Sequence, residues 1–235
     1  MPLHESDSII LKTYPLAEAD RIVVFFSRDY GKMRGVANGV RRLKSRFGAS
    51  LEPLARSKVA FFQKENRELV RIRSSELIDS PMKLFEDYDR AVMAGHVAEL
   101  VDRFLPDHEV QDSVFRLFEL ARRNLISGCE LELVRSYVEV WMLRLAGVFP
   151  EMFTCVTCGK KLQTGEHRVL LSGLTSVACG PCGANQGTDV PPTTIAALHW
   201  ILTTPLDSEV AGPDGAGLDH LRQLNKFWIE RYFER

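Results

Sequence analysis

Four cysteines, arranged in two closely spaced pairs, are the residues of this sequence with the clearest chemistry. Cys155 and Cys158 form one Cys-x-x-Cys-Gly unit, and after twenty further residues Cys179 and Cys182 form a second. Two intervening residues let both thiolates of a pair face one ion, and the following glycine permits the tight turn that directs backbone N–H groups at sulfur. The sequence therefore predicts one zinc ion per chain, bound by all four cysteines.

Four thiolate ligands fill a tetrahedral coordination sphere, so we expect a structural rather than a catalytic zinc ion. The alternatives are two disulfides, a redox pair, or iron in place of zinc. The doubled pattern and a cytosolic setting disfavour them. His167, between the pairs, is interpreted as a surface residue. A segment as short as residues 151–190 cannot bury a core of its own, so the metal would supply its folding free energy.

A run of basic residues without acids is the second informative region. From Tyr30 to Ser50 the sequence has no Asp or Glu and six cations, namely Lys32, Arg34, Arg41, Arg42, Lys44 and Arg46. Such a surface can track a phosphate backbone, and single-strand-binding barrels add aromatic side chains on which bases stack. The candidate stacking residues are Tyr14, Tyr30, Phe47, Phe61 and Phe62. Composition alone equally allows a solvated, highly charged loop.

The net charge of −1 does not reveal the basic run, because acidic residues concentrated later in the chain, between residues 85 and 112, offset its positive charge. A local basic patch can bind phosphates even in a chain of neutral overall charge. We find no Gly-x-x-x-x-Gly-Lys-Ser/Thr loop, no His-Glu-x-x-His and no Gly-x-Ser-x-Gly. The sequence therefore predicts a protein that is not an enzyme and has no catalytic residues. A nuclease whose site is assembled from distant residues remains an alternative.

The length and composition define the setting of these residues. A chain of 235 residues favours two domains, and 45% hydrophobic residues suffice for buried cores. No window holds about 18 uncharged apolar residues, so we expect no contact with a membrane. The N-terminal residues show no secretory signal, which predicts a cytoplasmic protein.

Residues 1–80 have the pattern of a small β-barrel. Five short runs of β-branched and aromatic residues are separated by turn residues, and the expected strands cover residues 8–14, 21–27, 33–37, 51–62 and 69–73. Pro53 within the fourth run suggests an edge or a bulge. Five strands in so short a segment favour a closed five-stranded OB-fold β-barrel, the predicted DNA-binding domain.

Helical periodicity begins after Pro81. Expected helices cover residues 84–104, a stretch capped by Asp112 or Ser113 and ended by Gly128, residues 130–146, a stretch after Pro191, and a last one from Leu218. The prediction is an α+β multidomain chain, in which the OB-fold barrel is followed by an α-helical domain at residues 81–235. The zinc module at about residues 151–190 is inserted in that domain.

The sequence resembles the RecO family of bacterial DNA repair and recombination mediators over nearly its whole length. The similarity rests on Glu18-Ala19-Asp20-Arg21-Ile22, on the segment Gly31 to Arg42, on Gly48 to Pro53, on Ser75-Glu76-Leu77, and on the Cys-x-x-Cys pairs. Asn38 departs from the family pattern, because many relatives carry lysine at that position. The combination of segments is specific, whereas each segment alone is weak.

The resemblance implies binding of single- and double-stranded DNA, annealing of complementary strands, and a place in the RecF pathway. It implies cooperation with RecR in loading the recombinase RecA onto DNA coated with single-strand-binding protein (SSB), and binding of the acidic C-terminal tail of SSB. It also implies association with the bacterial nucleoid. For the tail site the sequence offers only candidates, namely Arg116, Arg122, Arg123, Arg135 and Arg144. The alternative function is a zinc-stabilised protein–protein adaptor that does not bind DNA.

Overall fold

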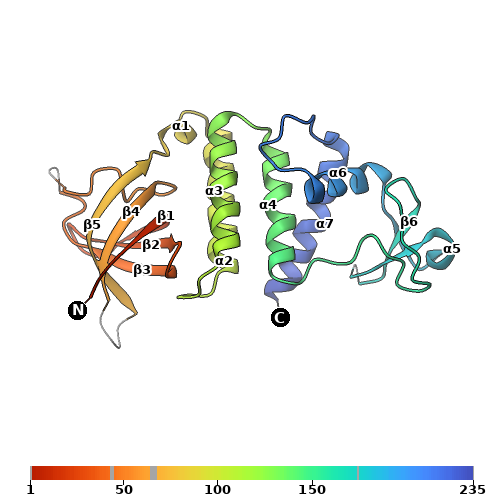
Figure 1. Ribbon diagram of the computed structural model, residues 1–235, viewed down its shortest axis with the longest axis horizontal. Coiled ribbons are helices and arrows are strands. Elements are labelled where there is room, and N and C mark those ends of the chain that lie inside the picture. Colours follow the sequence, from red (N-terminus) through yellow and green to blue (C-terminus); the bar gives the residue numbers. More distant parts are fainter. Residues whose placement is uncertain (1, 43–44, 64–67, 174, 235) are drawn as a thin grey trace. The chain divides into compact units, whose positions relative to one another are not determined.

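A computed structural model of the chain describes residues 2–42, 45–63, 68–173 and 175–234. The chain divides into two compact units, Met1–Gly128 and Cys129–Arg235. The first unit holds five strands and three helices, and the second holds the remaining helices and a small sheet (Figure 1). The domain boundary expected near residue 80 stays a prediction. The two compact units divide later in the chain, because the helices that directly follow the barrel belong to the first unit.

The first unit begins with a closed barrel of five strands. These are β1 (Leu3–Pro15), β2 (Arg21–Ser27), β3 (Gly31–Ala37), β4 (Arg56–Phe62) and β5 (Leu69–Asp79). The order around the barrel is β1-β2-β3-β5-β4, with β3 and β5 parallel and the other neighbours antiparallel. The prediction of a five-stranded OB-fold barrel is thereby confirmed.

The long first strand closes the barrel because it pairs on both sides. Its first half pairs with β4 and its second half with β2, and the register shifts between Ile10 and Lys12. A bulge at this point bends the strand, as closure of so small a barrel requires. Alternate side chains then face a common interior, which includes Ile10, Val23, Phe25, Met33, Val59, Phe61, Val70 and Ile72.

The fourth strand is shorter than expected. The sequence predicted a strand over residues 51–62, whereas β4 begins at Arg56 and residues 51–54 form a turn. Leu51 and Leu54 are buried nonetheless, and Leu54 has a φ of 68°. An apolar turn that packs into a barrel has the same composition as a buried strand, so hydrophobicity alone could not separate the two.

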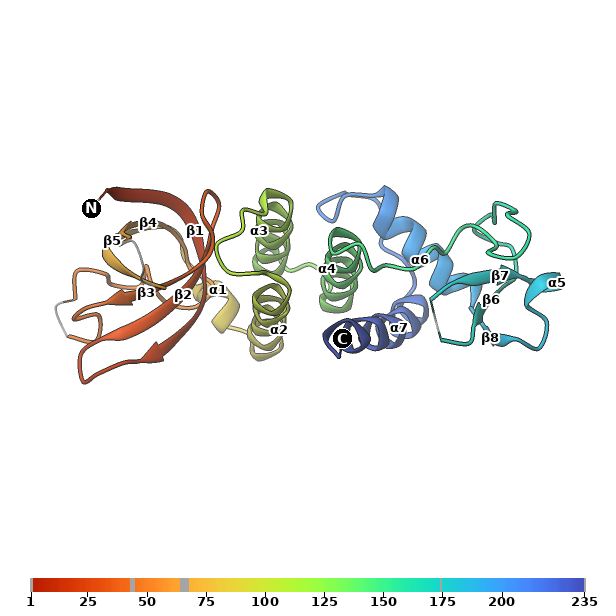
Figure 2. The ribbon, with the colours of Figure 1, turned by 90° about the horizontal axis from the view of Figure 1, so that it is seen from below.

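Three helices complete the first unit: α1 (Met82–Phe85), α2 (Tyr88–Phe104) and α3 (Asp112–Ser127). α2 and α3 run side by side next to the barrel (Figure 2). Asp87 caps α2 by accepting a hydrogen bond from the backbone N–H of Arg90. The N-cap of α3 is Gln111 rather than the expected Asp112 or Ser113, and Gly128 is the C-cap that ends the helix, as predicted.

The second unit contains α4 (Leu131–Leu145), α6 (Pro192–Thr203) and α7 (Gly215–Phe233), and α7 packs against both others. The Nε1–H of Trp141 on α4 donates to the carbonyl of Ile201 on α6, at 3.3 Å. In the chain, a small sheet of order β7-β6-β8 comes between α4 and α6. It is formed by β6 (Arg168–Leu171), β7 (Val177–Cys179) and β8 (Gly187–Asp189), with the short α5 (Gly180–Gly183). The predicted insertion of the four-cysteine module within the helical part of the chain is confirmed.

Among the described residues, no helix has both the length and the apolar character needed to cross a bilayer.

Candidate functional site

The four predicted metal ligands come together in the second unit. The Sγ atoms of Cys155, Cys158, Cys179 and Cys182 all lie within 4.8 Å of one another, and those of Cys158 and Cys179 are 3.9 Å apart. All four are free thiols. A tetrahedral zinc site with Zn–S bonds of about 2.3 Å places its sulfurs about 3.8 Å apart. The cluster therefore has the donor set and nearly the spacing that a tetrahedral metal ion needs.

The first cysteine pair is held by a tight backbone turn. The N–H of Gly159 donates to the carbonyl of Cys155 at 2.9 Å, and the N–H of Cys155 donates to the carbonyl of Lys160 at 2.9 Å. Gly159 has a φ of 72°, the left-handed conformation that glycine adopts without strain. The N–H of Val156 donates to Val177 of β7, so the turn is fixed to the strand that delivers Cys179.

The second pair spans the end of β7 and the short α5, where Cys179 is the last residue of the strand and Cys182 lies one turn further on. Buried Arg168 at the start of β6 holds the surrounding loop, because its guanidinium donates to the carbonyls of Met152 and Gln163. Burial lowers the pKa of Arg168. Backbone turns and one buried cation thus position the cysteines, since so short a segment has little apolar core.

The electrostatics of the cluster favour a bound cation. Backbone hydrogen bonds, first from Cys179 and then from Cys158, lower the pKa of the Cys155 thiol to about 6. Hydrogen bonding of the protonated thiol to its neighbours, first Cys179, raises the pKa of Cys182 to about 12. Four thiolates this close cannot all be ionised at neutral pH without a positive charge among them, which a metal ion would supply.

His167 lies outside the cysteine set. Its side chain is exposed, and its Nε2 lies 2.8 Å from a carboxylate oxygen of Asp189 on β8. Four sulfurs already complete a tetrahedral site, which leaves no position for a water molecule or a substrate. The arrangement fits a metal ion that holds the fold together.

Two of the six predicted DNA contacts are neutralised within the first unit. Lys32 is only 7% exposed, and its Nζ donates to the carbonyl of Asp102 at 2.8 Å and lies 3.2 Å from the carboxylate of Asp107. Arg34 is exposed, but its guanidinium lies 3.3 Å from the same Asp107. The two side chains share one face of β3, as their spacing predicted, and this face meets the segment that follows α2. Their position argues against a role in binding phosphates.

Three other predicted contacts are available to a ligand. Arg41, Arg42 and Arg46 are exposed, and the described residues provide no ion pair for any of them. Arg46 lies over the ring of Phe47, with 4.8 Å between the guanidinium carbon and the ring centroid. Leu43 and the predicted contact Lys44 lie outside the described residues.

The turn that carries Arg41 and Arg42 is fixed at its base. Asp20 accepts a hydrogen bond from the N–H of Gly39 at 2.7 Å, and the carbonyl of Ala19 accepts one from the N–H of Arg41 at 3.1 Å. Positive charges on an anchored turn can bind a polyanion with little loss of backbone entropy. The candidate nucleic-acid surface is therefore this turn at the end of β3.

Acidic residues of α2, α3 and their connection neutralise other barrel cations. Lys12 contacts Asp102 at 2.5 Å, Arg28 contacts Asp112 at 2.9 Å, and Arg56 contacts Glu119 at 2.9 Å. Hydrogen bonding to Asp7 is the main reason that the pKa of Arg56 is raised. Acidic residues from α2 to α3 thus screen one side of the barrel, whereas Arg41 and Arg42, in the turn after β3, have no carboxylate partner among the described residues.

Most of the candidate stacking residues belong to the core. Phe47 and Phe61 are buried, and Tyr30 packs against Phe61 with ring centroids 5.4 Å apart. Tyr14 is 45% exposed and Phe62 is partly exposed, so these two can meet a ligand.

The five arginine candidates for an acidic peptide differ in their partners. Arg116 pairs with Asp112, Arg122 with Asp79 and Glu119, Arg123 with Glu119, and Arg135 with Glu139. Arg144 is exposed and lies over the ring of Trp141 at 5.4 Å, and no carboxylate among the described residues pairs with it. Beside it, Leu145 is 44% exposed.

Sequence reasoning missed two further exposed cations, Arg71 and Arg73 on β5. The alternation of apolar and basic residues from Leu69 to Arg73 is the signal for them, because in a strand it places both arginines on the outward face.

Comparison with known proteins gives one consistent answer. The profile described as "Recombination protein O N terminal" matches residues 1–81, and "Recombination protein O C terminal" matches residues 85–235. The chain is 42% identical to a DNA repair protein RecO of Koribacter versatilis, over 90% of this chain and 85% of that protein. It is 34% identical to a DNA repair protein RecO of Geobacter metallireducens, over 97% of each chain, and 34% identical to one of Bifidobacterium longum subsp. infantis, over 100% and 96%.

Proposed function

The chain belongs to the recombination protein O family, with a role in DNA repair and recombination, and from this premise we propose that it is a mediator of the RecF pathway. In this proposal it binds single- and double-stranded DNA and anneals complementary strands without catalysing a reaction. With RecR, it helps to load RecA onto SSB-coated DNA. It acts in the cytoplasm, at the bacterial nucleoid.

The observation that carries the DNA-binding part is the exposed pair Arg41 and Arg42 on an anchored turn, with which no described carboxylate pairs. Exposed Arg46 follows further along the chain, whereas barrel cations such as Lys12 and Lys32 are paired with acids. Cations without a carboxylate partner can neutralise phosphates and release counterions, which makes the affinity depend steeply on salt. Two strands held on one basic surface repel each other less, and this favours annealing without a nucleotide fuel.

The first test is fluorescence anisotropy of a labelled single-stranded oligonucleotide across a salt series. We expect binding by the wild type that weakens as salt rises, and loss of most binding and annealing in the double variant Arg41→Glu/Arg42→Glu. The matched control is Lys83→Glu/Lys226→Glu, which changes the net charge equally at exposed helix positions. If both double variants anneal DNA like the wild type, the turn is not the DNA site.

Two other outcomes would favour the alternative functions. If the wild type fails to bind DNA even at low salt, the barrel is an interaction module of a protein–protein adaptor. Turnover of labelled DNA in the presence of Mg²⁺ would identify a nuclease, and a closed four-cysteine site could not account for it.

For the cysteine cluster we propose one structural Zn²⁺ per chain, held by Cys155, Cys158, Cys179 and Cys182. Soft thiolate donors in a tetrahedral set favour zinc over the hard cations Mg²⁺ and Ca²⁺. Bound zinc would fix the two turns and β7 to one another. Elemental analysis of purified protein should give one zinc atom per chain, and iron in its place would contradict this assignment.

For the SSB tail we propose Arg144 with Trp141 and Leu145 as the receiving residues. An acidic peptide needs an accessible cation, and Arg144 is exposed, lies over the ring of Trp141 and has no described carboxylate partner. Titration calorimetry with a tail peptide should show weaker binding to Arg144→Ala than to Arg116→Ala. Equal affinity of the two variants would exclude Arg144.

A further inference from the structure

The outer face of β5 presents two arginines. Arg71 and Arg73 alternate with Val70 and Ile72, which are at most 1% exposed and belong to the barrel core. Their side chains therefore point outward, and both are exposed. No carboxylate among the described residues pairs with either guanidinium. Arg73 lies over the partly exposed ring of Phe62 on β4, at 5.8 Å.

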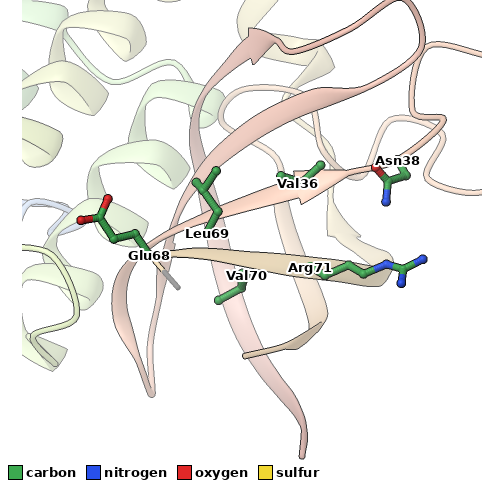
Figure 3. Close-up of a pocket in the computed structure, with 6 residues that line it drawn as sticks. All are labelled: Val36, Asn38, Glu68, Leu69, Val70 and Arg71. Carbon is green, nitrogen blue, oxygen red and sulfur yellow. The ribbon is translucent and has the colours of Figure 1, made fainter. Parts of the chain in front are cut away.

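A pocket of about 490 Å³ opens beside Arg71, where the parallel strands β3 and β5 pair. We call it the β3–β5 pocket, and its lining residues are Val36, Asn38, Glu68, Leu69, Val70 and Arg71. Figure 3 shows the side chains of Val36 and Leu69 near its middle, Asn38 and Arg71 at one end, and Glu68 at the other. The volume lies within the range of small-ligand sites.

The chemistry of the β3–β5 pocket matches a nucleobase with its flanking phosphates. Leu69 is 39% exposed although it is apolar, and with Val36 it offers a surface for a flat ring. The amide of Asn38 provides both a donor and an acceptor, as the edge of a base requires. Arg71 and Arg73 stand two residues apart on one strand face, so they can bind successive phosphates.

The pocket is also continuous with the proposed DNA surface. Asn38 directly follows β3, and the anchored turn that carries Arg41 and Arg42 comes next in the chain. A strand bound to those arginines could therefore continue past Asn38 onto β5.

We propose that the β3–β5 pocket receives one unpaired base of single-stranded DNA, with Leu69 and Val36 against its face and Arg71 and Arg73 at the adjoining phosphates. This inference rests on the proposed DNA-binding function and specifies which feature of the strand the barrel recognises. Bases of a duplex are stacked and paired, so they cannot enter the pocket. Single strands then gain a contact that duplexes lack, while both share the phosphate contacts.

The test compares full-length Leu69→Asn with Leu77→Asn, because both leucines lie on β5 and are 39% exposed, yet only Leu69 lines the pocket. Three labelled probes are titrated by fluorescence anisotropy: a thymidine oligomer, an oligomer of equal length with abasic sites throughout, and a duplex. The wild type should bind the thymidine oligomer about fivefold to tenfold more tightly than the abasic one. Leu69→Asn should lose this preference with unchanged duplex affinity, and Leu77→Asn should keep it.

Salt dependence provides a second arm. Arg71→Ala/Arg73→Ala should reduce the slope of log affinity against log salt for the thymidine oligomer by about 0.7 for each lost phosphate contact. Lys58→Ala should leave the slope unchanged, because Lys58 already pairs with Glu5 at 2.7 Å.

The outcomes separate the inference from the function on which it rests. If Leu69→Asn discriminates between thymidine and abasic oligomers as well as the wild type does, the pocket does not hold a base, although DNA binding stands. If the wild type binds none of the three probes, the proposed function fails as well. Loss of duplex binding in Leu69→Asn would also overturn the inference, because it would indicate a damaged barrel instead of a missing base contact.

Discussion

Arg122 is a charged side chain with no exposed surface. From α3 its guanidinium reaches Asp79 at the end of β5 and Glu119 one turn earlier on the same helix. Glu119 also lies 2.9 Å from the guanidinium of Arg56 on β4. Two arginines and two acids thus connect α3 to the barrel within the first unit. Buried charges of this kind contribute little net stability when paired and cost several kcal/mol when one partner is lost.

We predict that Glu119→Gln destabilises the first unit by about 3 kcal/mol, because it leaves Arg122 with half of its negative partners. Urea unfolding followed by circular dichroism measures the change. Glu86→Gln is the control, since Glu86 is exposed and should shift stability by no more than about 0.5 kcal/mol. Equal stability of the two variants would show that Asp79 alone suffices for Arg122.

Single residues were predictable from sequence where their partners are local. The short spacing within each cysteine pair identifies its two members as ligands of one ion, and the structure brings all four cysteines together. Lys32 looked like a phosphate contact because its acidic partners Asp102 and Asp107 lie far along the chain. Only the fold brings those carboxylates to β3, so a local count of charges could not identify which cations were neutralised.

At the scale of elements, the start of β3 depends on a close approach of two segments. Gly31 has a φ of 72°, and a Cβ built there would lie 2.1 Å from the carbonyl oxygen of Glu109. The N–H of His108 donates to the carbonyl of Lys32 at 3.0 Å, which fixes the connection between α2 and α3 to the strand. The absence of a side chain at residue 31 permits this contact.

We predict that Gly31→Ala destabilises the protein by about 2 kcal/mol or more, because backbone strain adds to the clash with Glu109. Gly95→Ala is the matched control: Gly95 lies in α2, a Cβ there would meet nothing within 4 Å, and alanine should stabilise the helix by up to about 1 kcal/mol. Thermal unfolding should move the two midpoints in opposite directions. A stabilised Gly31→Ala would contradict the close approach.

Strongly periodic elements were predictable and irregular ones were not. The bounds of β2 agree with the expected residues 21–27, and α4 differs from residues 130–146 by one residue at each end. The strand expected over residues 51–62 begins only at Arg56, because the residues before it form a turn. In this turn the N–H of Leu54 donates to the carbonyl of Ile10 on β1 at 2.8 Å. A turn stabilised by another strand leaves no periodic trace in its own sequence.

The whole molecule consists of two compact units with separate means of stabilisation. Residues 1–128 hold the barrel core and its ion pairs, and residues 129–235 hold three packed helices and the cysteine cluster. The proposed DNA site and the proposed zinc site lie in different units. Loss of metal should therefore affect one unit and spare the other.

We predict that a strong chelator raises hydrogen exchange in residues 151–190 and lowers the melting temperature of the second unit, because metal binding supplies the folding free energy of that segment. Amides of the barrel should keep their protection, and affinity for a single-stranded oligonucleotide should change less than twofold. Cys158→Ser should resemble the chelated protein before chelator is added. A parallel loss of barrel protection would show that the two units unfold together.

Closure of the barrel also bears on how the chain behaves when crowded. β1 pairs on both sides, and β5 lies between β3 and β4, so the described strands of the barrel form a ring in which each has two neighbours. An open edge offers unpaired N–H and C=O groups to a second copy and promotes aggregation. In the proposed function many copies gather on one DNA strand, which raises their local concentration, and the closed ring gives their barrels no open edge through which to join.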